Sequence, residues 1–169
     1  MKKILSMILV LIVSMSLFGC SDKKETIAYE FDYKFKEEYS EIDSMIAAVF
    51  LNLVDGLIKV HSTVLEAENQ TIDSEFNAYV ENKVAPLRDE FMNSPTSYTV
   101  EEVNVLKHMM EIAIASGKLQ IIKSEYDLDK TNEEMGLKRK NTAEYYTEQL
   151  EDFKDKIETL LEETNNFIN

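Results

Sequence analysis

The chain has 169 residues, with 32 acidic against 18 basic side chains and a formal net charge of −14 at pH 7. This acidity argues against nucleic-acid binding, which requires Lys and Arg to neutralise phosphates, and against a body that lies flat on an anionic lipid surface. Because the chain has only 4 glycines and 2 prolines, its composition favours long helices joined by few turns.

Residues 1–19 are typical of a secretory signal peptide. Lys2 and Lys3 precede an uncharged run from Ile4 to Phe18, and together they form the charged and apolar regions of such a signal. The run is shorter than the about 20 residues with which a helix crosses a membrane. We therefore predict that residues 1–19 are cleaved from the mature protein.

The residues around the expected cleavage site, Leu17-Phe18-Gly19-Cys20, resemble the lipobox of bacterial lipoproteins, in which a branched apolar residue precedes two mostly small residues and an invariant cysteine. The larger Phe18 departs from this pattern. Cys20 is the only cysteine, so lipid attachment would consume a thiol that has no disulfide partner within the chain. The resemblance implies that acyl chains such as palmitate on Cys20 hold the protein at the extracytoplasmic face of the cell membrane. Ser21 stands where an Asp retains many lipoproteins in the inner membrane, so we expect the outer membrane where the host has one.

Residues 27–35 alternate apolar residues with mostly charged ones, a pattern typical of a β-strand. Because no other stretch offers a partner strand, we expect this arm either to pack along the body or to be mobile; a spacing of four residues also permits a helix. The arm could extend a partner's sheet as an added strand, or it could be a plain spacer between lipid and body. The candidate partner-binding residues are Tyr29, Phe31, Tyr33 and Phe35.

Apolar residues at steps of three and four predict two helices in the first half of the body. The first covers about residues 36–68, and its nearly continuous apolar stretch over 45–54 predicts a central, buried helix. The second covers about residues 72–92. Within it, Pro86 removes a backbone donor, which predicts a kink near Val84.

Two Thr-x-x-Glu capping boxes predict where further helices begin. The box that begins at Thr99 predicts a third helix over residues 100–125. The box that begins at Thr131 predicts that a fourth helix follows a short connection over residues 127–130. A heptad pattern of apolar residues over 143–167 supports this fourth helix.

We therefore predict an all-α fold, an antiparallel up-and-down bundle of four helices over residues 36–169, after an N-terminal extended arm. Residues 20–35 would form the lipidated tether and the arm. The chain is long enough for one domain with its own hydrophobic core.

No residue pattern indicates catalytic, cofactor or metal chemistry. The only histidines are His61 and His108, and neither has the Glu three residues before it that di-metal helical bundles use; His108 has one in the reversed order. Asp127 begins like a calcium loop, but Asn132 and Lys138 replace the glycine and the bidentate glutamate that such a loop needs. The motifs of hydrolases and phosphate-binding loops do not occur either. We predict a non-catalytic protein with no cofactor and no metal.

Three features suit either a function or plain packing. Asn52 and Asp55 interrupt the most apolar stretch and mark a ligand or interface, or else lie on a narrow exposed stripe or form hydrogen bonds within the bundle. We expect Met109 and Met110 to fill the core. An acidic run over residues 148–163 is typical of a solvated face, and it would also suit a basic partner.

These observations predict a lipid-anchored, non-catalytic helical module that binds another protein of the cell envelope. One alternative is a protective lipoprotein against a toxin or phage factor, because an acidic body would steer a basic attacker towards itself. Another alternative is a carrier or sensor that holds a small apolar ligand between helices. The expected partners are the membrane, through lipid on Cys20, and a basic or envelope protein, but no nucleic acid.

Overall fold

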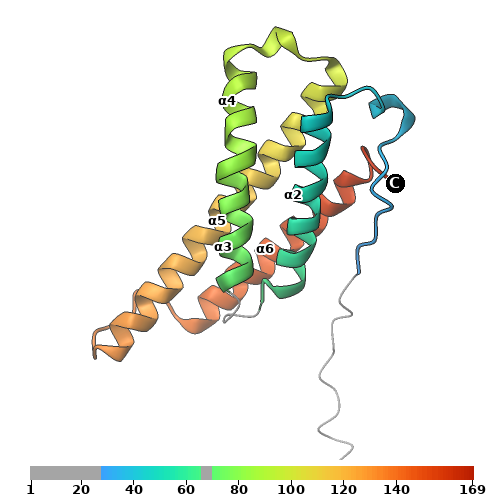
Figure 1. Cartoon of the computed structure of the whole chain (residues 1–169). Coiled ribbons are helices and arrows are strands. Elements are labelled where there is room, and N and C mark those ends of the chain that lie inside the picture. Colours follow the sequence, from blue (N-terminus) through green and yellow to red (C-terminus); the bar gives the residue numbers. More distant parts are fainter. Residues whose placement is uncertain (1–27, 66–69) are drawn as a thin grey trace, which may run out of the picture.

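A computed structural model describes residues 28–65 and 70–169 of the chain. The predicted signal peptide, Cys20 and the first residues of the tether lie outside the described residues. Within the described ranges the fold is all-α, with helices α2, α3, α4, α5 and α6, of which α3 and α4 form one rod (Figure 1). The prediction of four antiparallel helices is therefore confirmed.

Helix α2 (Ser44–Thr63) is the central helix of the bundle. The expected start near residue 36 is wrong, because the Asp43 carboxylate caps the helix by accepting hydrogen bonds from the backbone N–H groups of Met45 (2.8 Å) and Ile46 (3.3 Å). Residues 37–39 form a separate 3₁₀ turn, η1 (Glu37–Tyr39). By length and apolar composition α2 could cross a membrane, but in this fold it supplies much of the core. Its buried apolar residues are Ile46, Val49, Phe50, Leu53, Val54, Leu57 and Val60.

The second rod consists of α3 (Gln70–Tyr79), a π-helical turn η2 (Val80–Val84) and α4 (Ala85–Asn93). The N–H of Ala85 bonds to the carbonyl oxygen of Val80, five residues back, immediately before Pro86. A wide turn at this point accommodates a proline that has no N–H to donate. The predicted irregularity near Val84 is confirmed and takes the form of a π turn.

Helix α5 (Val100–Glu134) begins at the predicted capping box. The Thr99 hydroxyl accepts from the Glu102 N–H at 3.2 Å, and the Glu102 carboxylate accepts from the Thr99 N–H at 2.9 Å. The predicted end near residue 125 is wrong, because the helix continues to a C-terminal motif in which Gly136 has a φ of 73° and Leu137 donates to the Asn132 carbonyl at 2.8 Å.

Helix α6 (Ala143–Thr164) is capped by Thr142, whose hydroxyl accepts from the Tyr145 N–H at 3.2 Å. The second predicted capping box is wrong: Thr131 lies inside α5, where its hydroxyl donates to the Asp127 carbonyl at 2.8 Å. The heptad pattern is confirmed over most of its length. Its buried members are Tyr146, Phe153, Ile157, Leu160, Thr164 and Phe167.

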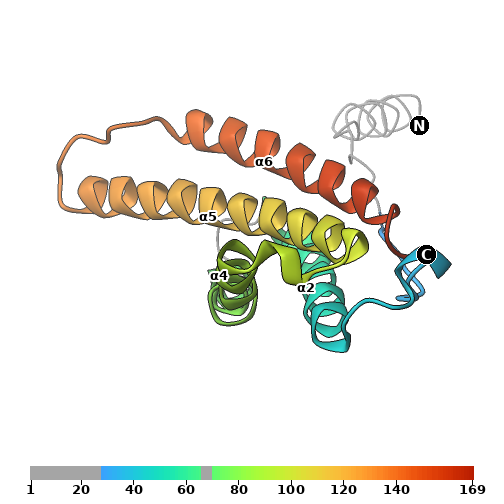
Figure 2. The same cartoon turned by 90° about the horizontal axis from the view of Figure 1, so that it is seen from above.

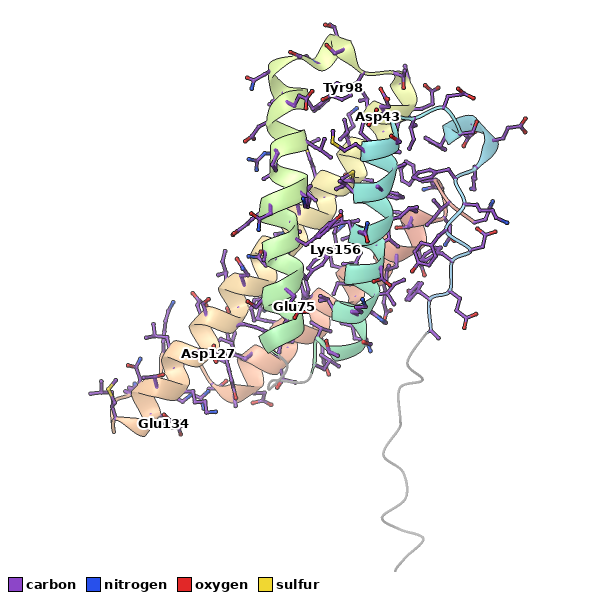
Figure 3. All side chains as sticks on the ribbon, in the orientation of Figure 1. Asp43, Glu75, Tyr98, Asp127, Glu134 and Lys156 are labelled. Carbon is purple, nitrogen blue, oxygen red and sulfur yellow. The ribbon has the colours of Figure 1, made fainter. Side chains whose placement is uncertain are left out.

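The helices run alternately up and down as two hairpins, α2 with the α3–α4 rod and α5 with α6 (Figure 1). Seen from above, α5 runs the length of the molecule with α6 on one side and α2 and α4 on the other (Figure 2). The end of the α5–α6 hairpin projects beyond the first hairpin, and Glu134 lies on this projection (Figure 3).

Candidate functional site

The described part of the arm, residues 28–35, packs along the bundle instead of standing away from it. As expected, the described residues contain no partner strand, and the arm makes only one isolated antiparallel bridge, between Phe35 and Ile168 near the C-terminus. Asn169 donates its N–H to the Lys34 carbonyl at 3.0 Å, and Asp32 donates to the Asn169 carbonyl at 2.7 Å. These backbone hydrogen bonds thus join the N-terminal and C-terminal ends of the described chain.

Three of the four candidate arm residues contact the body. The Tyr29 ring meets the His61 ring edge-on at 5.3 Å, and Phe35 lies 5.5 Å from Phe50. Phe31 also packs against the core cluster. Only Tyr33 is exposed, at 37%, and its φ of 55° is in the left-handed region, so the arm is not a continuous strand. Adding the arm to a partner's sheet would require these contacts to break.

Both histidines are buried and hydrogen-bonded. His61 shares a hydrogen bond of 3.1 Å with the Glu158 carboxylate. His108 bonds through Nε2 to the Thr164 hydroxyl at 3.1 Å and stacks on Phe167, with ring centroids 5.1 Å apart. Burial lowers the pKa of His108 to about 4, so its ring is neutral at pH 7.

His108 also belongs to a group whose ligand atoms could meet on a cation. One ligand atom each from His108, Glu111 and Glu163 lie within 4.8 Å of one another. The count resembles that of a zinc site with one open position. However, Glu111 is exposed and Glu163 half-exposed, and water can solvate both carboxylates without a metal. We assign no metal to this group.

The sequence hint of a calcium loop corresponds instead to a buried structural hub at Asp129. Its side chain, only 2% exposed, accepts from the N–H groups of Lys140 and Asn141, both at 2.8 Å, and from the Tyr146 hydroxyl at 2.9 Å. These hydrogen bonds lower the pKa of Asp129, and the bond from the Lys140 N–H has the largest effect. One carboxylate therefore fastens the end of α5 to the start of α6.

A polar seam between α3 and α5 was not foreseen from the sequence. Asp73 and Lys123 form an ion pair whose side chains are 8% and 13% exposed. Asn77 lies one helical turn after Asp73 on α3, and its side-chain oxygen accepts a hydrogen bond of 3.2 Å from the Ser116 hydroxyl of α5. Because both pairs join α3 to α5, we assign them a structural role.

Two hollows on the surface are candidates for binding. A cleft of about 200 Å³ lies between α5 and α6, lined by apolar parts of residues such as Ile122, Tyr126 and Leu150. A larger, open groove of about 590 Å³ lies between α2 and the α3–α4 rod, beside the π turn. The groove is lined by Met45, Ala48, Val49, Asn52, Tyr79, Asn82, Lys83, Pro86, Leu87 and Glu90.

The packing of α2 against the α3–α4 rod explains where the groove lies. At Gly56 the helices are so close that an added Cβ would lie 2.7 Å from the Phe76 ring. The groove lies towards the opposite ends of the helices, next to Pro86 and the wide turn η2. A third hollow, of about 230 Å³, adjoins the groove at Asn52 and Tyr79 and extends to Asp55.

Asn52 and Asp55 behave as the plainer interpretation predicted. Asn52 is exposed and donates to the Ala48 carbonyl at 2.8 Å, and Asp55 pairs with Lys59 at 2.7 Å. Both side chains have partners within α2. Asn52 also lines the groove, and both residues line the adjoining hollow of about 230 Å³. Of the two methionines expected in the core, Met109 is fully buried and Met110 is half-buried.

The acidic run on α6 forms a mostly solvated face. Two of its carboxylates, Glu158 and Glu163, lie beside the buried histidines. The other carboxylates of this face form no ion pair within 4.0 Å with another described residue. They are all exposed: Glu148, Glu151, Asp152, Asp155 and Glu162.

Comparison of the chain with protein-family models, curated proteins and solved structures gave no match.

Proposed function

We propose that the protein is a lipid-anchored, non-catalytic protein-binding module on the extracytoplasmic face of the cell envelope, attached through Cys20. The observation that supports the binding role best is the groove between α2 and the α3–α4 rod. Val49 and Leu87 are its buried apolar members, and Met45 beside them is 56% exposed. Grooves of this kind bind an amphipathic helix, whose apolar face contacts their apolar side chains.

The partner that suits this surface carries basic residues beside its apolar face. The chain has a net charge of −14, and α6 adds a row of exposed carboxylates. An acidic surface of this kind attracts a cationic partner over a distance and speeds association more than it adds affinity. Apolar contacts in the groove would then supply most of the affinity.

The experiment compares two exposed methionines in the full-length chain, expressed in its own host. Met45 lines the groove, whereas Met92, 68% exposed on α4, does not. A photo-crosslinking residue at position 45 should capture one dominant protein that position 92 does not capture. Met45→Glu should lower its recovery by roughly tenfold or more, and Met92→Glu should leave it unchanged. Identical capture profiles at the two positions would contradict the proposed role of the groove.

The arm is a second candidate for the binding element. Tyr33→Ser changes the one exposed aromatic residue of the arm and leaves the packed ones in place. If this variant loses the partner while Met45→Glu retains it, the arm binds the partner. If neither Tyr33→Ser nor replacement of all four aromatic residues by Ser affects binding, the arm has only the spacer and packing role.

The two alternative functions differ in their support. A protective lipoprotein fits the acidic α6 face, and equal sensitivity of a deletion strain and its parent to competitor bacteria and phages would remove that alternative. A carrier of small apolar ligands would use the cleft of about 200 Å³. That volume is below the roughly 300–1,000 Å³ of most ligand pockets. The groove of about 590 Å³ is within this range, but it is open along α2 and so suits a helix better than an enclosed small ligand.

A further inference from the structure

Helix α5 carries an apolar stripe on its solvent side. Four large apolar side chains recur at every seventh position and are 62–63% exposed: Ile114, Ile121, Leu128 and Met135. Isolated exposed apolar residues are common, but a heptad row along one helix is typical of a coiled-coil seam. The row is independent of the groove on α2.

The stripe alternates large and small residues. Between the large side chains lie Gly117, Ser124 and Thr131, three residues after Ile114, Ile121 and Leu128. In heptad terms the large residues occupy position a and the small ones position d. Buried residues of α5 such as Met109, Ile112, Ala115, Ser116 and Leu119 lie at the other positions, so the seam points away from the core of its own bundle.

Gly117 has no explanation within its own chain. A Cβ added there would meet nothing within 4 Å, and its backbone is ordinary helix. A glycine inside a helix costs about 0.5–1 kcal/mol relative to alanine. Its absent side chain would allow a second helix to approach closely at this point of the seam.

We propose that the exposed face of α5 binds the same face of a second copy of this chain, as a symmetric antiparallel pair of helices. The seam is complementary to itself in one register. There Ile121 lies opposite Ser124 of the other copy, Leu128 opposite Gly117, and Ile114 opposite Thr131. Each of these three side chains meets a small one, and at the two ends of the seam Met135 meets Met110. Every contact occurs twice, as in a two-fold symmetric interface. The seam from Met110 to Met135 spans roughly 38 Å, more than three heptads.

The charges beside the seam fit the same register. Antiparallel pairing brings Lys118 of one copy near Glu125 of the other, and symmetry repeats the pair. Glu125 already has a partner in Lys140 at 3.6 Å, but both side chains are at least 40% exposed. Such exposed pairs are worth little and can be shared, so this contact does not oppose association.

The test uses full-length chains that carry two different tags and are co-expressed in the host. Wild-type copies should co-purify in mild detergent, and Ile121→Gln should reduce co-purification by roughly tenfold. Val100→Gln is the matched control, because Val100 is 71% exposed on the same face of α5 but lies before Met110, outside the segment that pairs. Circular dichroism should show equal helicity for both variants, since neither residue is buried.

A charge exchange tests the register itself. Lys118→Glu and Glu125→Lys should each weaken co-purification, and the double variant should restore it. Ile121→Cys on one copy and Ser124→Cys on the other should form an intermolecular disulfide more efficiently than the control pair Val100→Cys and Ser124→Cys. Absence of co-purification, failure of the double variant to restore it, or capture of a different protein by a photo-crosslinking residue at position 121 would each overturn the proposal.

Discussion

The hydroxyl of Tyr146 donates a hydrogen bond of 2.9 Å to the carboxylate of Asp129, and both residues are 2% exposed. The same carboxylate accepts from the backbone of residues 140 and 141. A buried acid therefore joins the two helices where the hairpin between α5 and α6 closes, beside the edge-on contact of the Tyr126 and Tyr146 rings. This arrangement holds the projecting end of the molecule, which has no cover from the first hairpin (Figure 3).

Asp129→Asn should loosen this hairpin. An amide offers one acceptor oxygen and a donor group, so it cannot accept all three hydrogen bonds that the carboxylate accepts. We expect faster amide hydrogen exchange at residues 140 and 141 and a lower urea midpoint. Asp152→Asn, an exposed change on α6, should alter neither quantity. Unchanged exchange in Asp129→Asn would contradict the hub role.

The same acid should contribute to stability in acid solution. Because its folded-state pKa is lowered from 3.8, Asp129 stabilises the fold above that value, and this contribution is lost as pH falls further. The free energies of unfolding of wild type and Asp129→Asn should therefore converge as the pH falls below 3.8. Urea unfolding over pH 2–5 measures this, and a constant difference between the two proteins would refute it.

His108 should destabilise the fold at mildly acidic pH. Burial lowers its pKa from 6.5 to about 4, so the unfolded chain binds a proton that the folded chain does not bind between these values. The free energy of unfolding is thus highest above the unfolded pKa of His108 and falls by up to about 3 kcal/mol as pH decreases to 4. His108→Gln should remove this slope. An equal slope in both proteins over pH 4–7 would assign it to other groups.

The buried ion pair between Asp73 and Lys123 should show strong non-additivity. Lys123→Met leaves the acid buried without its cation, at a cost of roughly 3–5 kcal/mol in the free energy of unfolding. Asp73→Leu together with Lys123→Met should cost much less, because no charge remains buried. A double-mutant cycle by urea unfolding measures the coupling. If the double variant is as unstable as the sum of the single changes, the pair does not act as a unit.

Two helical glycines should respond oppositely to alanine. Gly56→Ala brings a methyl group against Phe76 and should destabilise the protein by about 1–3 kcal/mol. Gly117→Ala meets open space and should stabilise each copy by about 0.5–1 kcal/mol. Thermal unfolding of both variants is the measurement. A stabilised Gly56→Ala would contradict the packing against Phe76, and a destabilised Gly117→Ala would contradict the open space beside Gly117.

Local signals predicted the helices where tertiary contacts did not compete with them. The Thr99 box begins a helix as expected, and the similar pattern at Thr131 does not. The difference arises because Asp129 and Tyr126 pair with Tyr146 across the hairpin and keep α5 helical beyond its expected end. Gly136 was the local stop signal, since only its positive φ allows the C-terminal motif.

Contacts between distant parts of the chain were beyond sequence reasoning. The pattern of the arm predicted an extended segment, but its partner is the last residues of the chain, where no strand pattern occurs. Asp73 and Lys123 each look like surface charges, and only the packing of α3 on α5 buries them together. The groove likewise depends on how Gly56 and Pro86 position two helices, which neither residue alone indicates.

Intact mass spectrometry of the protein extracted from host membranes tests whether a lipid on Cys20 holds the protein-binding body at the outer face of a membrane. We expect a chain that begins at Cys20 and carries the added mass of a diacylglycerol, whereas Cys20→Ala should leave the protein unprocessed and without lipid. A wild-type chain that retains residues 1–19, or one whose Cys20 carries a free thiol, would contradict this expectation.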